Sequence, residues 1–165
     1  MPDAFELQAL PLKEYFGRVA GLLARGIDLS GLTAFLTQQP FEETRPYLVW
    51  RHLLPLDPRF SRIQIVYDPS VAEQIRAVYW DFTVKLSELM ALFGQYNLHH
   101  EPQGESTAFT FPVIDPALSS IKTRHPQWLT ELPKGAGFAY IHPESGERMA
   151  LPDPEFSFVQ FNLKN

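Results

Sequence analysis

Cysteine is absent from this sequence of 165 residues. Its absence excludes thiolate nucleophiles, disulfide bonds, iron–sulfur clusters and cysteine zinc sites, so only histidine and carboxylate side chains remain as metal ligands. No local pattern points to a prosthetic group either. We therefore predict that the protein works without a cofactor.

Long apolar runs are also missing. Charged residues interrupt every hydrophobic segment before it reaches about 18 residues, the length needed to span a bilayer. The first residues include Asp3 and Glu6, where a secretory signal carries a basic region. We therefore expect a soluble protein of the cytoplasm, with no signal peptide and no membrane partner.

Basic residues are few and scattered. The chain has 14 Lys and Arg against 19 Asp and Glu, which gives a net charge of -5. Duplex binding needs a stripe of cations that displaces counterions, so we expect no nucleic acid partner. An acidic protein instead attracts basic proteins electrostatically.

Motifs for catalysis are not found. There is no Gly-x-Ser-x-Gly elbow, and the glycines at 135 and 137 precede a strand-like segment, whereas phosphate-binding glycines open a helix. The acidic pair Glu42 and Glu43 lies in the first turn of a predicted helix, where it complements the helix dipole. We predict no catalytic residue, and the sequence favours a protein that is not an enzyme.

The composition is typical of one folded domain. Hydrophobic residues make up 45% of the chain and charged residues 20%, close to globular averages. We expect residues 1–165 to form a single α+β domain. It divides into a helical part, 10–55, and a part with a strand, a long helix and hairpins, 60–165.

Residues 10–55 show helical periodicity. Apolar residues recur every three or four positions over 12–23, and Gly26 is placed to end that helix. The same criteria predict a second helix over 28–40 and a third over 44–54.

The centre of the sequence predicts a strand and then a long helix. In residues 62–67, Ile63, Ile65 and Tyr67 point to one side and β-branched residues dominate, which is typical of a strand. Ser70 and Glu73 match the pattern of a helix N-cap. Apolar residues then recur every three or four positions over 71–93, and Gly94 is placed to end the segment. This pattern predicts one helix of about 24 residues.

From residue 96 onward the apolar period changes to two. It predicts antiparallel hairpins over 96–113 and 137–151 and a last strand over 156–163, with a short helix or an ordered loop at 118–132. We therefore predict an α+β fold. In it, N-terminal helices plus one long central helix pack on a mainly antiparallel sheet of about five or six short strands.

The predicted long helix has a second apolar face. Ala77, Trp80, Val84 and Ala91 fall almost opposite its main apolar stripe. Either the helix is central and covered on both sides, or these four residues form a patch that binds a partner. The sequence leaves both alternatives open, and the burial of Trp80 distinguishes them.

A group of polar side chains follows this helix. Tyr96, His99, His100 and Glu101 are close in sequence, and a neutral imidazole near an acid acts as a base near neutral pH. We consider them polar groups of a pocket between the predicted long helix and the predicted sheet, whose strands carry many aromatic side chains. Adjacent strand residues face opposite sides, so His99 and His100 do not share an ion, and we predict no metal site.

Three hypotheses about function follow. The first is a small protein-binding module, such as an immunity protein that neutralises a toxin domain or an adaptor, which occludes a surface of a basic partner. The second is a small-ligand-binding protein or an enzyme that uses the pocket. The third is a homo-oligomeric structural protein, in the simplest case a homodimer, which pairs through the Trp80 face or the last strand, Phe156 to Leu163.

Overall fold

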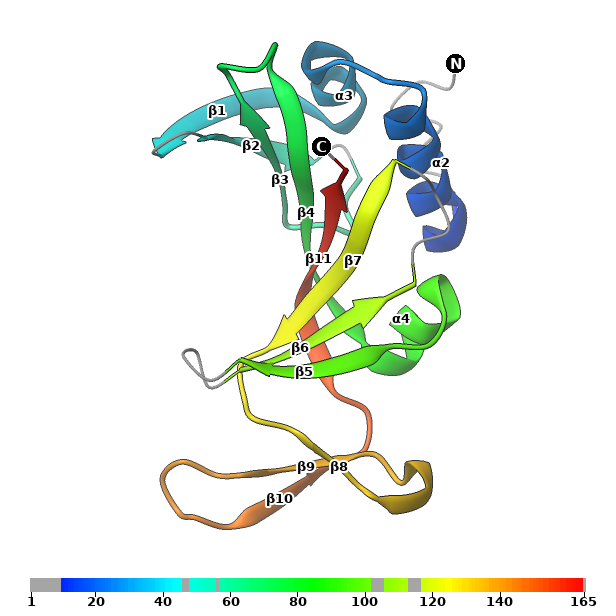
Figure 1. The fold of residues 1–165 in the computed structure, drawn as a ribbon, viewed down its shortest axis with the longest axis vertical. Helices are drawn as coiled ribbons and strands as arrows, with labels where there is room; N and C mark the ends of the chain where they lie inside the picture. Colours follow the sequence, from blue (N-terminus) through cyan, green and yellow to red (C-terminus); the bar gives the residue numbers. More distant parts are fainter. Residues whose placement is uncertain (1–9, 46–47, 56, 102–105, 113–116, 165) are drawn as a thin grey trace.

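A computed structural model describes residues 10–45, 48–55, 57–101, 106–112 and 117–164, and Figure 1 shows their arrangement. The predicted turn at 101–106 lies largely outside these ranges, as do Asp3 and Glu6. Within them, the chain forms short helices and two antiparallel sheets. The elements in chain order are α2 (Leu12–Ala24), α3 (Leu29–Leu36), β1 (Thr37–Arg45), β2 (Leu48–Pro55), β3 (Arg62–Asp68), β4 (Gln74–Lys85), α4 (Leu86–Phe93), β5 (Asn97–Glu101), β6 (Ser106–Phe111), β7 (Leu118–His125), β8 (Thr130–Glu131), η1 (Pro133–Gly135), β9 (Phe138–Ile141), β10 (Arg148–Leu151) and β11 (Glu155–Leu163).

The larger sheet has the strand order β1-β2-β3-β4-β11-β7-β6-β5. Strands β1 to β4 form one meander and β5 to β7 another. The last strand, β11, joins the two because it pairs antiparallel with β4 on one side and with β7 on the other. The last strand is thus an inner strand of the sheet, paired with β4 over 155–162 and with β7 over 160–163, and not the terminal edge strand that we expected.

The smaller sheet, in the order β10-β9-β8, lies between β7 and β11 in the chain. It forms the lower end of the molecule in Figure 1, away from α2 and α3. In this sheet β10 is an edge strand, since it pairs with β9 alone.

The main core lies between the larger sheet and its helices (Figure 1). Trp80 of β4 is fully buried there, with its ring centroid 5.1 Å from that of Phe16 in α2 and 4.7 Å from that of Phe161 in β11. Its indole N–H donates to the hydroxyl of Tyr15 at 3.0 Å. Burial raises the pKa of Tyr15 above its ordinary value. Apolar side chains spaced at helical intervals thus fix α2 on the sheet.

The predicted long helix over 71–93 is wrong. Residues 74–85 form strand β4, and only Leu86–Phe93 are helical, as α4. The strand is central, with Trp80 buried toward the helices and Ala77 buried on the other face. Further residues of that other face, Asp81 and Thr83, are polar and not buried. A register shift next to Ile75 places Ile75 and Val78 in the core and Phe82 against it, at spacings of three and four, which is why the segment also fits the helical period. Its β-branched and aromatic residues favour the strand.

The predicted N-cap at Ser70 and Glu73 is instead the turn between β3 and β4. Asp68 Oδ1 accepts hydrogen bonds from the backbone N–H of Ser70 at 2.9 Å and from its hydroxyl at 2.6 Å. Ala72 and Glu73 have φ angles of 50° and 54°. This local hydrogen bonding and these left-handed conformations reverse the chain, as hairpin turns require.

Two other segments, one predicted as a helix and one as a short helix or an ordered loop, contain strands. The segment predicted as a helix over 44–54 contains the end of β1 and most of β2, and 118–132 contains β7 and β8. Pairing with β3 and β11, which lie elsewhere in the sequence, supplies backbone hydrogen bonds that outweigh weak local periodicity. The helix at 12–24 and strands β3, β5, β6, β9, β10 and β11 agree with the predictions, and the predicted helix over 28–40 is helical only as far as Leu36. The chain is a mixture of helices and antiparallel strands.

Candidate partner-binding surface

Large apolar side chains that remain exposed are concentrated on the smaller sheet. Among the described residues they are Val71, Trp128, Ile141 and Met149, with exposed fractions of 48%, 44%, 71% and 37%. All but Val71 lie in β8 to β10 or just before β8, with Met149, which pairs with Tyr140, on the opposite face from Ile141. Clustered exposed apolar side chains mark contact surfaces more often than isolated ones do.

One face of the smaller sheet is fixed to the larger sheet. Phe138 is buried, with its ring centroid 5.7 Å from that of Phe109 and 6.0 Å from that of Tyr96. A Cβ atom on Gly137 would lie 2.6 Å from the Cα atom of Pro152, and φ is 104° at this glycine. Only glycine fits such a close approach at positive φ. The opposite face of the smaller sheet, which carries Ala139 and Ile141 of β9, is therefore held in a defined orientation.

This exposed face contains a groove of about 450 Å³, lined by Trp128, Thr130, Ala139, Tyr140, Ile141 and Arg148. Strand pairing explains its shape. Ala139 is paired with Thr130 on one side and with Ala150 on the other, so small side chains form a row across the sheet. Ile141 and Arg148 are paired one row further toward the hairpin turn. The groove thus has a low floor beside taller apolar side chains and one guanidinium group.

Trp128 is exposed yet held in place. The imidazole of His100 stacks on its indole with ring centroids 4.2 Å apart and an angle of 5° between the planes, and His100 Nε2 lies 2.6 Å from the carbonyl oxygen of Leu129. Thr107 donates to the carbonyl of Gln127 at 2.8 Å and accepts from the N–H of Leu129 at 2.8 Å. A side chain fixed in this way loses little conformational entropy when a partner binds.

The turn between β9 and β10 is also fixed. Nδ1 of His142 accepts hydrogen bonds from the backbone N–H groups of Glu144 and Ser145 at 3.2 and 3.3 Å. The N–H of Gly146, whose φ is 72°, donates to the His142 carbonyl at 2.9 Å. The imidazole thus satisfies backbone N–H groups that have no main-chain acceptor within the turn. The ordered turn keeps Ile141 and Arg148 paired at the ends of the two strands.

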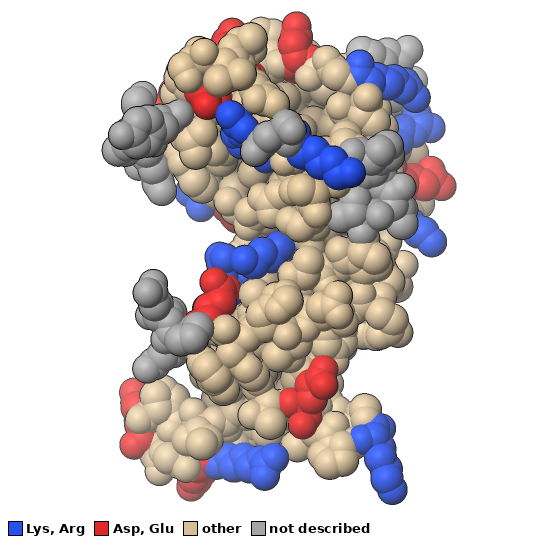
Figure 2. Space-filling model, in the orientation of Figure 1, with Lys and Arg blue, Asp and Glu red and all other residues tan. Residues whose placement is uncertain are grey.

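Charges surround the groove unevenly. Residues 127–155 contain five acidic and two basic residues, namely Glu131, Glu144, Glu147, Asp153, Glu155, Lys134 and Arg148. Figure 2 shows both signs at the lower end of the molecule, with uncharged surface between them. The ion pairs between described residues do not include Arg148. The region is acidic as a whole, and a single cation borders the groove.

A second hollow of about 530 Å³ lies between α4 and the smaller sheet. On one side, the hydroxyl of Tyr96 donates to Glu131 at 2.6 Å. On another, Ser87 donates to Asp153 from its hydroxyl at 2.6 Å and from its N–H at 3.0 Å. Burial and the bond to Glu131 raise the pKa of Tyr96 to about 12. Apolar groups such as Met90 complete the lining.

The predicted partner-binding set of Ala77, Trp80, Val84 and Ala91 does not form a surface. The first three lie on β4 and are 6%, 0% and 1% exposed, and Ala91 is exposed on α4. Ala77 lies on the sheet face opposite to Trp80, because their positions differ by an odd number along the strand. The set was defined by a helix that the chain does not form, and Trp80 is buried inside the domain.

The structure separates the predicted polar group. Tyr96 borders the second hollow, and His100 supports Trp128. His99 and Glu101 lie on the other face of β5, since side chains alternate along a strand. There Arg124 donates to Glu101, and this hydrogen bond lowers the pKa of the carboxyl group. These four residues therefore do not share one pocket.

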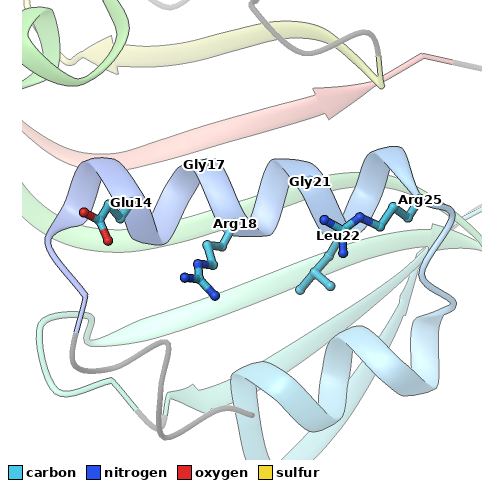
Figure 3. Close-up of a pocket in the computed structure, with 6 residues that line it drawn as sticks. All are labelled: Glu14, Gly17, Arg18, Gly21, Leu22 and Arg25. Atoms are coloured by element: carbon cyan, nitrogen blue, oxygen red, sulfur yellow. The ribbon is translucent and has the colours of Figure 1, made fainter. Parts of the chain in front are cut away.

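A third hollow, of about 430 Å³, runs along the outer side of α2 (Figure 3). Arg18 and Arg25 line it beside Gly17 and Gly21. No described atom other than the helix's own lies within 4 Å of a Cβ atom built on either glycine. A stretch of small residues on a helix does not by itself identify a ligand, so we assign no function to this hollow.

The sequence patterns above do not single out Trp128, Ile141 or Arg148. The predicted strands over 137–142 and 147–151 agree with β9 and β10, so the position of Ile141 beside a hairpin turn was available as a signal. Trp128 gave none, because it follows Pro126 in a segment without a regular period. Whether such a side chain is exposed depends on tertiary packing.

Within the described ranges, no three His, Asp or Glu side chains gather closely enough to hold a metal ion. None of the helices described is both long and apolar enough to cross a membrane. Comparisons with known protein families, with curated proteins and with solved structures find no match to this chain.

Proposed function

We propose that the chain is a protein-binding module that acts by occluding a surface of its partner, as an immunity protein or an adaptor does. The observation that carries the proposal is the groove of the smaller sheet, where Trp128 and Ile141 are exposed beside Arg148. The opposite face of this sheet packs against the core through Phe138, and the face with the groove keeps Trp128 and Ile141 in contact with solvent.

The chemistry of the groove supports this proposal. Tryptophan and arginine are among the residue types that dominate binding energy at protein interfaces, and Trp128 and Arg148 both line it. The stacking of His100 on Trp128 and the hydrogen bonds of His142 within the β9–β10 turn fix the sides of the groove in the free protein. Preorganisation of this kind increases affinity, because less side-chain freedom is lost on binding.

The charge of the molecule supports a basic partner. The net charge of the chain is -5, and the part that contains the groove has more acidic than basic residues. Charges around an interface act mainly on the association rate and on the choice of partner. Association should therefore slow down as salt is added, since salt screens exposed charges.

The test compares variants of the exposed apolar side chains. The tagged chain is cross-linked and purified from its source cells as wild type, as Trp128→Ala and as Ile141→Ser. Val71→Ser is the matched control, because Val71 is also exposed but lies in the turn between β3 and β4. A partner retained by the wild type and the control, and lost from both groove variants, would support the proposal. A partner retained by all four, or no partner at all, would contradict it.

The hollow beside Tyr96 favours a second candidate function, the binding of a small ligand. The carboxylates of Glu131 and Asp153 face an apolar lining there, which suits a ligand with a cationic group on a hydrocarbon body. A thermal-shift series with small alkyl amines tests it. Stabilisation that is lost in Glu131→Gln would support this function, and the absence of any shift would count against it.

A further inference from the structure

The outer edge of β10 carries backbone groups that none of the described strands pairs with. The N–H of His142 donates to the carbonyl of Glu147 at 2.8 Å, which makes this pair, at the turn end of the hairpin, a hydrogen-bonded pair. Such pairs alternate along an antiparallel ladder. The next pair, Ile141 with Arg148, is therefore not hydrogen-bonded, and neither is Ala139 with Ala150. The N–H and C=O groups of Arg148 and Ala150 consequently point away from β9.

The pairing on the other side of β9 gives the same result independently. The N–H of Leu132 donates to the carbonyl of Gly137 at 2.9 Å. By alternation, the next hydrogen-bonded pair is Thr130 with Ala139. The backbone of Ala139 is thus directed toward β8 and cannot also bond to Ala150. Both ladders place the free donors and acceptors of β10 on its outer edge.

The side chains beside this edge define what a strand added there must carry. A residue opposite Ala150 would lie at the end of the row of small residues formed by Ala139 and Thr130. A large apolar side chain at this position leans over the row into the groove. A residue opposite Arg148 lies beside a guanidinium group that has no ion pair with any described residue, so a carboxylate is favoured there.

We infer that β10 accepts an extended segment of the protein partner by strand addition, with a large apolar residue opposite Ala150 and an Asp or Glu opposite Arg148. This inference rests on the proposed function and names its binding mode. Main-chain hydrogen bonds then supply affinity and the two side-chain positions supply specificity. One carboxylate in the segment is compatible with a partner that is basic overall, since the two charges act at different distances.

The edge of β10 also has features that favour the addition of one short strand over pairing between many copies of the chain. It is short, running from Arg148 to Leu151, and Pro152 follows directly. Short edges that carry a charge or end at a proline resist pairing between copies of the same protein. The charged residue on the edge is the one that the added strand must match.

The experiment selects peptides and then tests the direction of their hydrogen bonds. A displayed library of random peptides, about seven residues long, is panned against the full chain. We expect enriched sequences with an acidic residue two positions from a large apolar one. The best peptide is then synthesised, and its affinity for the wild type is compared with that of versions N-methylated at each position in turn.

N-methylation should weaken binding at alternate positions only, by about tenfold for each lost backbone hydrogen bond. On the protein side, Ala150→Pro removes an N–H that β9 does not use, so the hairpin keeps its ladder while the peptide loses a partner. Arg148→Glu should weaken binding, and a peptide with lysine in place of its acidic residue should restore it. The N-methylated series uses the unaltered protein and stands even where a variant fails to fold.

The outcomes separate this inference from the proposed function. If no such sequence is enriched, or if N-methylation has no alternating effect, strand addition is wrong. Should Trp128→Ala and Ile141→Ser still release the cellular partner, the proposed function would stand without it. If Ala150→Pro instead converts a dimer of the chain into a monomer, the edge pairs with a second copy and the inference is also overturned.

Discussion

Trp80 and Trp128 lie in two regions of the molecule, of which one buries the tryptophan side chain and the other leaves it partly exposed. Trp80 is fully buried, its N–H bonded to Tyr15 and its ring surrounded by aromatic side chains from α2 and β11. Trp128 is 44% exposed and rests on a single imidazole, that of His100. Both are ordered by specific contacts, but only the first is covered.

The difference follows from the helices. The larger sheet has α2, α3 and α4 over the face that carries Trp80, so its apolar side chains find partners within the chain (Figure 1). Among the described elements, no helix lies over the face of the smaller sheet that carries Ile141, and this side chain stays 71% exposed. Apolar surface kept exposed on a well-ordered sheet serves recognition better than stability.

The largest expected effect tests this contrast directly. Trp80→Ala should lower the free energy of unfolding by about 3–5 kcal/mol, because it leaves a cavity and removes the donor to Tyr15. Trp128→Ala should lower it by no more than about 1 kcal/mol, since much of its surface is already in water. Urea unfolding of the two variants measures both values. Similar losses for the two would show that Trp128 is part of the core.

The next effect concerns the junction between the two regions. Gly137→Ala should destabilise the protein by about 1–3 kcal/mol, because the added Cβ atom would meet the backbone of Pro152. Gly135→Ala is the control, since φ is positive there too, at 70°, but no described atom lies within 4 Å of its Cβ position. Hydrogen exchange should show faster opening of β8 to β10 in the first variant than in the second. Equal hydrogen-exchange rates in the two variants would mean that the backbone at Pro152 shifts to accommodate the added Cβ atom.

Part of this fold could be predicted from the sequence because local signals agreed with it. The helix at 12–24 has apolar residues at helical spacing and a glycine at its end, and the hairpin at 138–151 has alternation on both sides of a Pro-Glu-Ser-Gly turn. In both segments, propensity, period and turn chemistry indicate the same structure. Such agreement is what makes a local prediction hold.

The wrong helix prediction over 71–93 has a physical cause. Side chains along 78–85 of β4 do alternate, because Val78, Trp80 and Val84 are buried while the residues between them on the other face are not. A register shift next to Ile75, however, places Ile75 and Val78 in the core and Phe82 against it, at spacings of three and four, as in a helix. The apolar residues on opposite sides of the predicted helix have the same cause: Val78, Trp80, Phe82 and Val84 pack on one face of the strand, and residues two positions apart would fall on almost opposite sides of a helix. The groove could not be predicted in the same way, because it depends on which elements leave β9 and β10 uncovered.

A smaller effect is expected from pH at the end of β7, where the chain leaves the larger sheet. His125 is buried with its ring against Phe156, and burial lowers its pKa below the ordinary 6.5. Its stabilising contribution is therefore complete above pH 6.5. It is lost as the pH falls from there through the folded-state pKa, because the unfolded chain then binds the proton first. In urea unfolding, His125→Gln should lose less stability than the wild type over this pH range. Parallel curves would show that His125 does not contribute.

The smallest expected effect strengthens the covered region and leaves the exposed one unchanged. Gly17 and Gly21 lie inside α2, on the side that faces away from Trp80 and borders the hollow of Figure 3. Glycine inside a helix is less favourable than alanine by about 0.5–1 kcal/mol, and no other described atom occupies the space of the added methyl group. Each Gly→Ala variant should therefore raise the free energy of unfolding by about this amount. Affinity for a partner bound at Trp128 should not change, because α2 lies at a distance from the smaller sheet (Figure 1). Weaker partner binding in either variant would place the contact on α2 and remove the functional contrast between the two tryptophans.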